Sequence, residues 1–298
     1  METVPEEKSN KRPTKYIVLA IIAIFALAIG FFGVTSFQNK QKTNDQKEVS
    51  RPNDWKEDTN NQKDPEEKTS TNKVTWMPTA DGWQASTSDL PSCPNPVIKT
   101  PVDLTNVTSI LYPGQTRGGD YKPHGGFRFN NATSSEVTVA APMDAVVVNG
   151  SRYLVGGELQ YVFDFISPCG MMYRLGHLLT LDPKYQKIAD SFPQAKEGDS
   201  RTENLDPPIE VTIGETIATE VGVTKGGINA FFDFGVYNVL IKNEASQSAA
   251  WAAKPEHDPI LAQHALCWFD MLPKEDAVKV KSLPGADAVA GKTSDFCK

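Results

Sequence analysis

The sequence predicts a mainly β, antiparallel sheet or sandwich-like domain that follows one transmembrane helix and a flexible stalk. Three observations predict this arrangement. An uncharged apolar segment lies near the N-terminus, an almost wholly polar segment follows it, and short apolar or alternating runs separated by turn residues begin after Trp76. The chain of 298 residues leaves room after these N-terminal segments for one domain of roughly 200 residues with a core of its own.

The apolar segment covers residues 16–37 and reads YIVLAIIAIFALAIGFFGVTSF, without a charged residue. An α-helix needs about 20 apolar residues to cross a bilayer about 30 Å thick, so we expect a transmembrane anchor. Basic residues flank it on both sides and favour, by a slight excess, a cytoplasmic tail of residues 1–15. The main alternative is a signal peptide with a cleavage site at Ala26-Leu27-Ala28. Both interpretations export the rest of the chain.

Residues 38–75 are expected to form a flexible linker. Between Gln41 and Lys73 the chain is almost wholly polar, and Trp55 is its only aromatic residue. Such a segment cannot bury enough apolar surface to offset the entropy lost on ordering. We therefore expect a stalk that holds the domain away from the membrane.

Charge and cysteine content restrict the partners and the compartment. The net charge of -7 argues against nucleic acid, whose binding depends on neutralising phosphates with Lys and Arg. Four cysteines in an exported domain permit two disulfides in any of three connectivities. We favour Cys93 with Cys169 at the N-terminal edge and Cys267 with Cys297 at the C-terminal tail. None of the four has zinc-finger spacing.

Strands are predicted from apolar or alternating runs bounded by Gly, Pro and Asn. The richest in β-branched and aromatic residues are LQYVFDFI at residues 159–166 and AFFDFGV at residues 230–236, and we expect these to be central strands. Further strands are expected at residues 109–112, 126–130, 137–140, 145–149, 171–175, 209–213 and 216–219.

Two helices are predicted in the domain. One is a short helix over residues 184–192, inside a polar insertion that runs to Pro208. The other begins at Asp258, where an Asp N-cap and Pro259 in the first turn precede the apolar run ILAQHALCWF. We assign residues 76–272 to the domain and leave residues 273–298 as a C-terminal tail of unassigned structure.

Three segments, in this order, resemble the LytM/lysostaphin-type metallopeptidases, which are zinc enzymes that cut peptide cross-bridges in bacterial cell walls. HGGFRF at residues 124–129, followed by VAAPMDAVVV at residues 139–148, is similar to the family's His-x-Gly-x-Asp-Phe motif and the hairpin after it. MYRLGHL at residues 172–178 is similar to its Tyr-x-x-Leu-x-His-Leu strand. VTIGETIATEVG at residues 211–222, with AFFDFGV after it, is similar to the strand that ends in His-x-His.

The resemblance implies a LytM-type fold with a groove, but only part of the family's zinc site. His124 matches the first zinc ligand and His177 a catalytic histidine. Arg128 stands where the ligand Asp is expected, and a guanidinium cannot coordinate a cation. Asp233 replaces the last ligand His, and Phe231 replaces a catalytic His. Since the positions of Arg128 and Asp233 converge on one point in the family's fold, we expect these two residues to form an ion pair in place of the metal.

Two hypotheses of different class follow. The first is a membrane-anchored, extracytoplasmic LytM-like module without catalysis or cofactor, which binds peptidoglycan or regulates an envelope enzyme through His124, Arg128, Phe231 and Asp233. The second is an active zinc metallopeptidase that cleaves peptidoglycan peptides through a rearranged site. In it, His124 and Asp233 bind the metal, together with His177 in a two-His-one-carboxylate set. The first is favoured, because Arg128 beside a dication would weaken the second.

Overall fold

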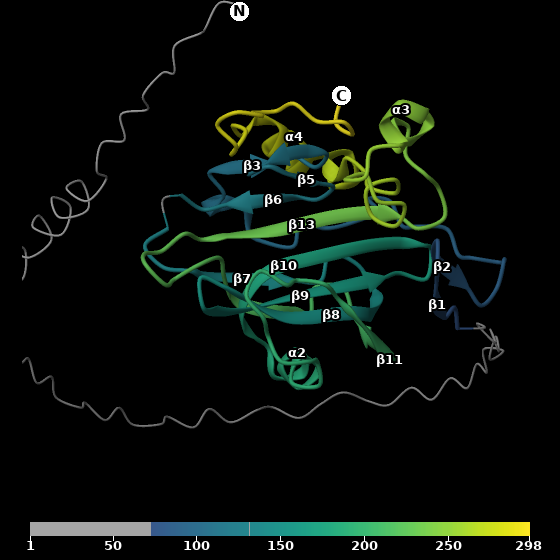
Figure 1. The fold of residues 1–298 in the computed structure, drawn as a ribbon, viewed down its shortest axis with the longest axis horizontal. Coiled ribbons are helices and arrows are strands. Elements are labelled where there is room, and N and C mark those ends of the chain that lie inside the picture. Colours follow the sequence, from purple (N-terminus) through teal and green to yellow (C-terminus); the bar gives the residue numbers. More distant parts are fainter. Residues whose placement is uncertain (1–72, 131) are drawn as a thin grey trace, which may run out of the picture. The chain divides into compact units, whose positions relative to one another are not determined.

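The computed structural model describes residues 73–130 and 132–298, and this part of the chain is mainly β, with antiparallel sheets and few helices (Figure 1). The predicted N-terminal tail, the transmembrane segment at residues 16–37 and all but the end of the linker lie outside the described residues. Within the described residues, no helix is both long and apolar enough to cross a membrane.

A nine-stranded sheet forms the centre of the domain, with the strand order β11-β8-β9-β10-β13-β6-β3 and with β12 and β7 joined beside β10. Every strand pair in it is antiparallel. The strands are β3 (Ser109–Leu111), β6 (Gly125–Arg128), β7 (Glu136–Ala140), β8 (Ala145–Val155), β9 (Glu158–Ile166), β10 (Met171–Leu181), β11 (Glu203–Val211), β12 (Thr216–Val221) and β13 (Phe231–Asn238).

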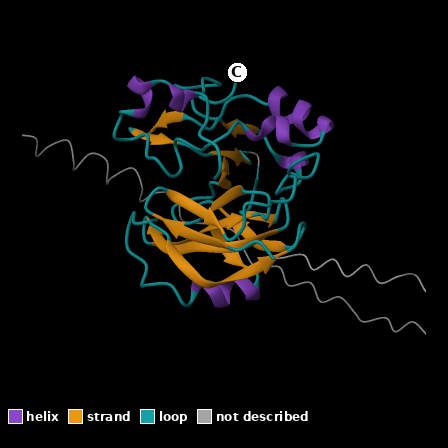
Figure 2. Ribbon diagram, turned by 90° about the vertical axis from the view of Figure 1, so that its right-hand side faces the viewer, coloured by secondary structure: helices purple, strands orange, loops and turns teal. Residues whose placement is uncertain are grey.

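Two small hairpins and a few short helices surround this sheet. The hairpins are β1–β2 (Trp76–Thr79 and Gly82–Ala85) and β4–β5 (Gln115–Arg117 and Asp120–Lys122). The α-helices are α2 (Pro183–Ala189), α3 (Ala249–Ala252) and α4 (Lys274–Ser282), and the 3-10 helices are η2 (Leu104–Asn106), η3 (Ala245–Gln247) and η4 (Trp268–Met271). Helix α2 lies at one end of the domain, and α3 and α4 lie at the other (Figures 1 and 2).

The hydrophobic core divides between the two faces of the sheet because side chains alternate along each strand. On one face, Phe163, Phe165 and Tyr173 belong to the larger cluster, and the rings of Phe165 and Tyr173 stack at 4.5 Å. On the other face, Ile166 and its neighbours in β10 and β13 pack under Trp76 of the β1–β2 hairpin in a smaller cluster. The remainder of this second face is polar and carries the candidate site.

Most predicted elements are confirmed. Each predicted strand coincides with an observed strand of the central sheet, and the helix predicted over residues 184–192 corresponds to α2, which Asp182 caps by accepting from the N–H of Lys184. Both favoured disulfides are present, Cys93–Cys169 and Cys267–Cys297. Disulfides persist in oxidising compartments, so they agree with a domain outside the cytoplasm.

The helix predicted to begin at Asp258 is wrong. The Asp258 carboxylate accepts from the N–H groups of Ile260 and Leu261, as an N-cap does, but the chain continues as turns until η4. Its backbone bonds to β13 instead, because the N–H of Leu266 donates to the carbonyl of Val236. Pairing with a neighbouring strand therefore overrides a local helix signal.

The C-terminal residues pack onto the sheet. Beyond α4, residues 284–298 form a segment of turns and isolated bridges that we call the C-terminal strap. The N–H of Ile110 in β3 donates to the carbonyl of Pro284, and the carbonyl of Ile110 accepts from Ala286. Farther along, the N–H of Asp295 donates to the carbonyl of Gly114, and Cys297 closes the disulfide to Cys267. The strap thus fixes the segment from β3 to β5 that leads into the site.

Candidate functional site

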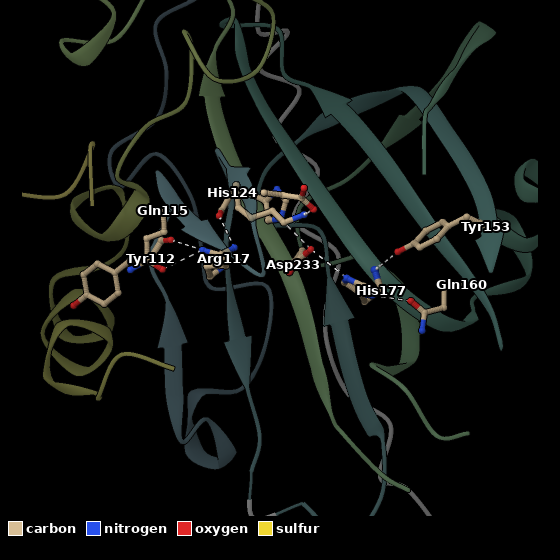
Figure 3. A network of polar contacts seen from close by, with 10 residues as sticks. Tyr112, Gln115, Arg117, His124, Tyr153, Gln160, His177 and Asp233 are labelled. Atoms are coloured by element: carbon tan, nitrogen blue, oxygen red, sulfur yellow. Dashed lines mark hydrogen bonds and ion pairs between the residues drawn. The ribbon is translucent and has the colours of Figure 1, made fainter. Parts of the chain in front are cut away.

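The centre of the candidate site is a carboxylate held between two histidines. Oδ2 of Asp233 lies 3.0 Å from Nε2 of His124 and 3.3 Å from Nε2 of His177 (Figure 3). The three side chains expose 18%, 22% and 20% of their surface for His124, His177 and Asp233. The residues that the sequence selected on three separate motifs therefore meet at one point.

Strand register brings these residues together. His124 directly precedes β6, and Asp233 in β13 lies opposite Gly126 of β6 on one side and Gly176 of β10 on the other. Glycine is required at position 126, since a Cβ there would come within 2.5 Å of the carbonyl oxygen of Phe232. At Gly125 a Cβ would come within 2.4 Å of the carbonyl oxygen of Leu111. The two glycines after His124 thus allow the close backbone packing that sets its position.

His177 has an unusual backbone conformation. Its φ of 60° lies in the left-handed region, and it is the only described non-glycine residue with a positive φ. The residue occupies a bulge in β10, where the pairing with β9 shifts between Leu175 and Leu178. Its carbonyl accepts from the N–H of Gly222, and its own N–H donates to the hydroxyl of Tyr153 at 3.2 Å. Such conformations persist where the surroundings enforce them, often at functional sites.

Gln160 sets the tautomer of His177. Its Nε2 donates to the carbonyl of Gly222 at 2.7 Å, which fixes the orientation of the carboxamide, and its Oε1 lies 2.7 Å from Nδ1 of His177. An amide oxygen only accepts, so Nδ1 of His177 carries the proton. Nε2 of His177 is then the ring nitrogen that faces Asp233 and the open side of the site.

The carboxylate is ionised at neutral pH. Burial raises the pKa of Asp233, but the charge and the hydrogen bonds of His124 and His177 outweigh this effect and hold that pKa well below its usual range. Burial lowers the pKa of His124, although Asp233 acts in the opposite direction. An anion clamped between two imidazoles is therefore the ground state of the site.

No protein-family model and no curated protein matches this chain.

The predicted ion pair between Arg128 and Asp233 is not formed among the described residues. Nη1 of Arg128 instead donates to Oδ1 of Asn229 at 3.2 Å, and the guanidinium lies over the ring of Phe231, 4.8 Å from its centroid. The register explains the difference. Arg128 is opposite Phe231, two residues before Asp233 in β13, and the two histidines already satisfy the carboxylate.

The donor atoms of the site are of a type that zinc accepts, since imidazole nitrogen and carboxylate oxygen are both common ligands. Their arrangement is a hydrogen-bonded one, and in residues 73–130 and 132–298 no group of three or more His, Cys, Asp or Glu side chains is placed as a metal site. Zinc coordination by His124 and Asp233 therefore stays a prediction.

Several polar residues around the site were not selected from the sequence. Arg117 donates from Nη2 to the carbonyl of His124 at 3.1 Å and from Nη1 to that of Tyr112 at 2.7 Å, which ties the β4–β5 hairpin to the site. On the face of the sheet that carries the site, which we call the sheet floor, Nη1 of Arg174 in β10 pairs with Oδ2 of Asp164 in β9 at 3.3 Å. The sequence could have indicated Asp164, because a charged residue inside an otherwise apolar strand is unusual. It could not have indicated Arg117, because an arginine in a Gly-rich hairpin is typical of a solvent-exposed turn.

Proposed function

We propose that this chain is a membrane-anchored, extracytoplasmic LytM-like module that binds peptidoglycan, or regulates an envelope enzyme, without catalysing hydrolysis. One observation carries the proposal. The carboxylate of Asp233, at the position where the resemblance expects a metal ligand, is held by His124 and His177 together. These close contacts with both imidazoles occupy the atoms that a metal would need.

Two further replacements support loss of the family's chemistry. Hydrolysis by this family needs a metal-activated water and side chains that move protons or stabilise charge. Phe231, where the resemblance expects a catalytic histidine, has no proton to move. Arg128 brings a positive charge to the position of a ligand carboxylate, and like charges disfavour a cation there.

The compartment also belongs to the proposal. The two disulfides agree with an oxidising environment, and the uncharged segment at residues 16–37 has the length of a membrane span. A polymer that surrounds a cell lies within reach of a domain held on such an anchor. The partners we propose are therefore peptidoglycan or an envelope protein, with no role for nucleic acid.

The second candidate is a zinc metallopeptidase, and one observation favours it. Nε2 of His124, Nε2 of His177 and Oδ2 of Asp233 converge. Because Gln160 keeps the proton on Nδ1 of His177, the facing Nε2 has a lone pair when this ring is neutral. If a metal displaced these contacts, two imidazole nitrogens and one carboxylate oxygen would be available as its ligands. The positive charge of Arg128 nearby would oppose the binding of a metal cation.

Cosedimentation with insoluble peptidoglycan separates the two candidates. The full chain in detergent is incubated with purified peptidoglycan in EDTA or in zinc, and bound protein and newly released amino groups are measured. We expect binding that is equal in both conditions and no release of amino groups. Release that needs zinc and disappears in His177→Ala would support the hydrolase. Absence of both binding and release would contradict peptidoglycan as the ligand or substrate and would leave regulation of an envelope enzyme as the function.

A further inference from the structure

Arg128 is a cation without an anionic partner in the described residues. Its guanidinium makes one hydrogen bond to protein, from Nη1 to Asn229, and its Nε is buried without an acceptor. A buried donor that lacks an acceptor is costly, by roughly as much as a hydrogen bond contributes. Arginine also presents two parallel N–H groups on an edge, a geometry that matches a carboxylate.

The other arginines near this face are satisfied in different ways. Arg174 pairs with the carboxylate of Asp164, and Arg117 donates to the carbonyls of Tyr112 and His124. On the surface, Arg201 makes two hydrogen bonds to the carboxylate of Asp199, at 2.7 Å each. The deficit at Arg128 is therefore a property of this position rather than of arginines in this fold.

The surroundings of Arg128 hold it at the rim of the site. Phe231 lies under the guanidinium, and the same ring contacts the ring of His177 at 4.6 Å between centroids. A cation on an aromatic face keeps its edge free for an in-plane acceptor. Asp233 does not serve as that acceptor, because both histidines hold its Oδ2.

One acidic side chain near this rim, Asp287, lies within the field of Arg117 and Arg128. Backbone N–H groups of Ala290 and Val289 lower the pKa of Asp287 in the C-terminal strap, and Arg117 and Arg128 lower it further from a distance. Asp287 is engaged by its own turn, since its Oδ1 accepts from the same two N–H groups.

We propose that Arg128 is a carboxylate-recognition residue, which binds the terminal or side-chain carboxylate of a peptide at the rim of the site. The inference rests on the proposed function, since it names the chemical group by which the module would select its ligand. At the position where the resemblance predicts a metal ligand, the chain would then have a residue that binds an anion.

A pair of soluble probes tests this directly. N-acetyl-L-lysyl-D-alanyl-D-alanine and its C-terminal amide differ in one carboxylate, and each is titrated into the full chain in detergent by calorimetry. We expect the acid to bind at least about tenfold more tightly than the amide, since a charge-assisted bidentate pair is lost in the amide. Arg128→Gln should abolish the difference, and Arg128→Lys should retain part of it.

Arg201→Gln is the matched control, because it removes an exposed guanidinium and should leave the preference unchanged. Equal binding of acid and amide to the unaltered chain would overturn the inference, whatever the variants do. So would a preference that survives Arg128→Gln. Failure of both probes to bind also overturns the inference. If the chain still sediments with peptidoglycan in that case, the polymer binds at another place on the chain, and the proposed function is supported without the role of Arg128.

Discussion

Gln160 shows how a single side chain determines the geometry of the site. It is fully buried, and its amide nitrogen and oxygen are both used, by the carbonyl of Gly222 and by Nδ1 of His177. Among the described residues, the Gln160 carboxamide makes no other hydrogen bond than these two. The orientation of His177 therefore depends on one residue of β9 and not on the motif that contains the histidine.

Replacement of Gln160 by Leu should lower the free energy of unfolding by about 2 to 4 kcal/mol, because it leaves two buried polar groups without partners. Urea denaturation of the full chain measures the loss, and the ¹⁵N chemical shifts of His177 report whether Nδ1 still carries the proton. Gln194→Leu, at an exposed position, is the control and should change neither. A variant that kept both its stability and the tautomer would contradict this role.

The ion pair of Asp164 and Arg174 is the second test at this scale. Both side chains lie on the sheet floor, and that of Asp164 exposes only 3% of its surface. Removal of one partner of a buried pair is strongly destabilising, whereas replacement of both by apolar residues is often neutral. We expect Asp164→Leu to cost about 3 kcal/mol or more, and Asp164→Leu with Arg174→Met to recover most of that loss.

Urea denaturation of both single variants and the double variant gives the coupling free energy. Asp199→Leu breaks the exposed pair with Arg201 and should cost far less, since solvent screens such pairs. Additive losses from Asp164→Leu and Arg174→Met would show that the two residues do not act as a pair.

Strands could be predicted from the sequence because each carries its own signal. Apolar runs and β-branched and aromatic content are local signals, and β9 and β13 have both, although β9 is buried along seven consecutive residues instead of alternating. Elements that depend on distant partners could not. The turns after Asp258 are fixed by β13, and α4 has a mixed pattern in which only Ala277 and Val280 are buried.

The same division applies to the site. His124, His177 and Asp233 were found because their motifs occur in a recognisable order, and the sheet brings them together. The side-chain partners could not be found, because a pairing register decides them. Arg128 lies opposite Phe231 rather than Asp233 for this reason, and Gln160 reaches His177 only because β10 has a bulge.

The C-terminal strap gives a test at the scale of elements. Its disulfide joins residues 30 apart in the sequence, and that of Cys93 and Cys169 joins residues 76 apart. On the loop-entropy relation, removal should cost about 3.5 and about 4.5 kcal/mol, respectively, as upper values. We expect Cys267→Ser with Cys297→Ser to free the strap, which limited proteolysis of the full chain would detect as early cleavage after residue 284.

Cys93→Ser with Cys169→Ser is the comparison, because neither cysteine of this disulfide belongs to the strap and its removal should leave the cleavage rate of the strap unchanged. Equal acceleration in both double variants would show that the strap responds to global stability and not to its own disulfide.

For the whole molecule, the buried site predicts how stability changes with pH. The pKa of His124 is lowered in the folded state from an ordinary value of 6.5, mainly by burial. Between the lowered value and 6.5 the unfolded chain binds more protons, so the free energy of unfolding falls as pH decreases below 6.5. The pKa of Asp233 is lowered as well, which adds a loss in the same direction below its ordinary value of 3.8.

Urea denaturation of the full chain between pH 5 and pH 8 measures the first effect. We expect stability to be greatest above pH 6.5 and to decline on acidification, and His124→Asn to flatten this decline. A constant or rising stability toward pH 5 would contradict the burial of a neutral His124.

The central claim is that the His124–Asp233–His177 cluster is closed by contacts among its own side chains and serves binding instead of metal catalysis. Calorimetric titration of zinc into the metal-free full chain in detergent tests it most directly, with His124→Ala as the control. We expect no stoichiometric zinc binding that depends on His124. Tight one-to-one binding that His124→Ala abolishes would contradict it and would make the zinc metallopeptidase the better explanation.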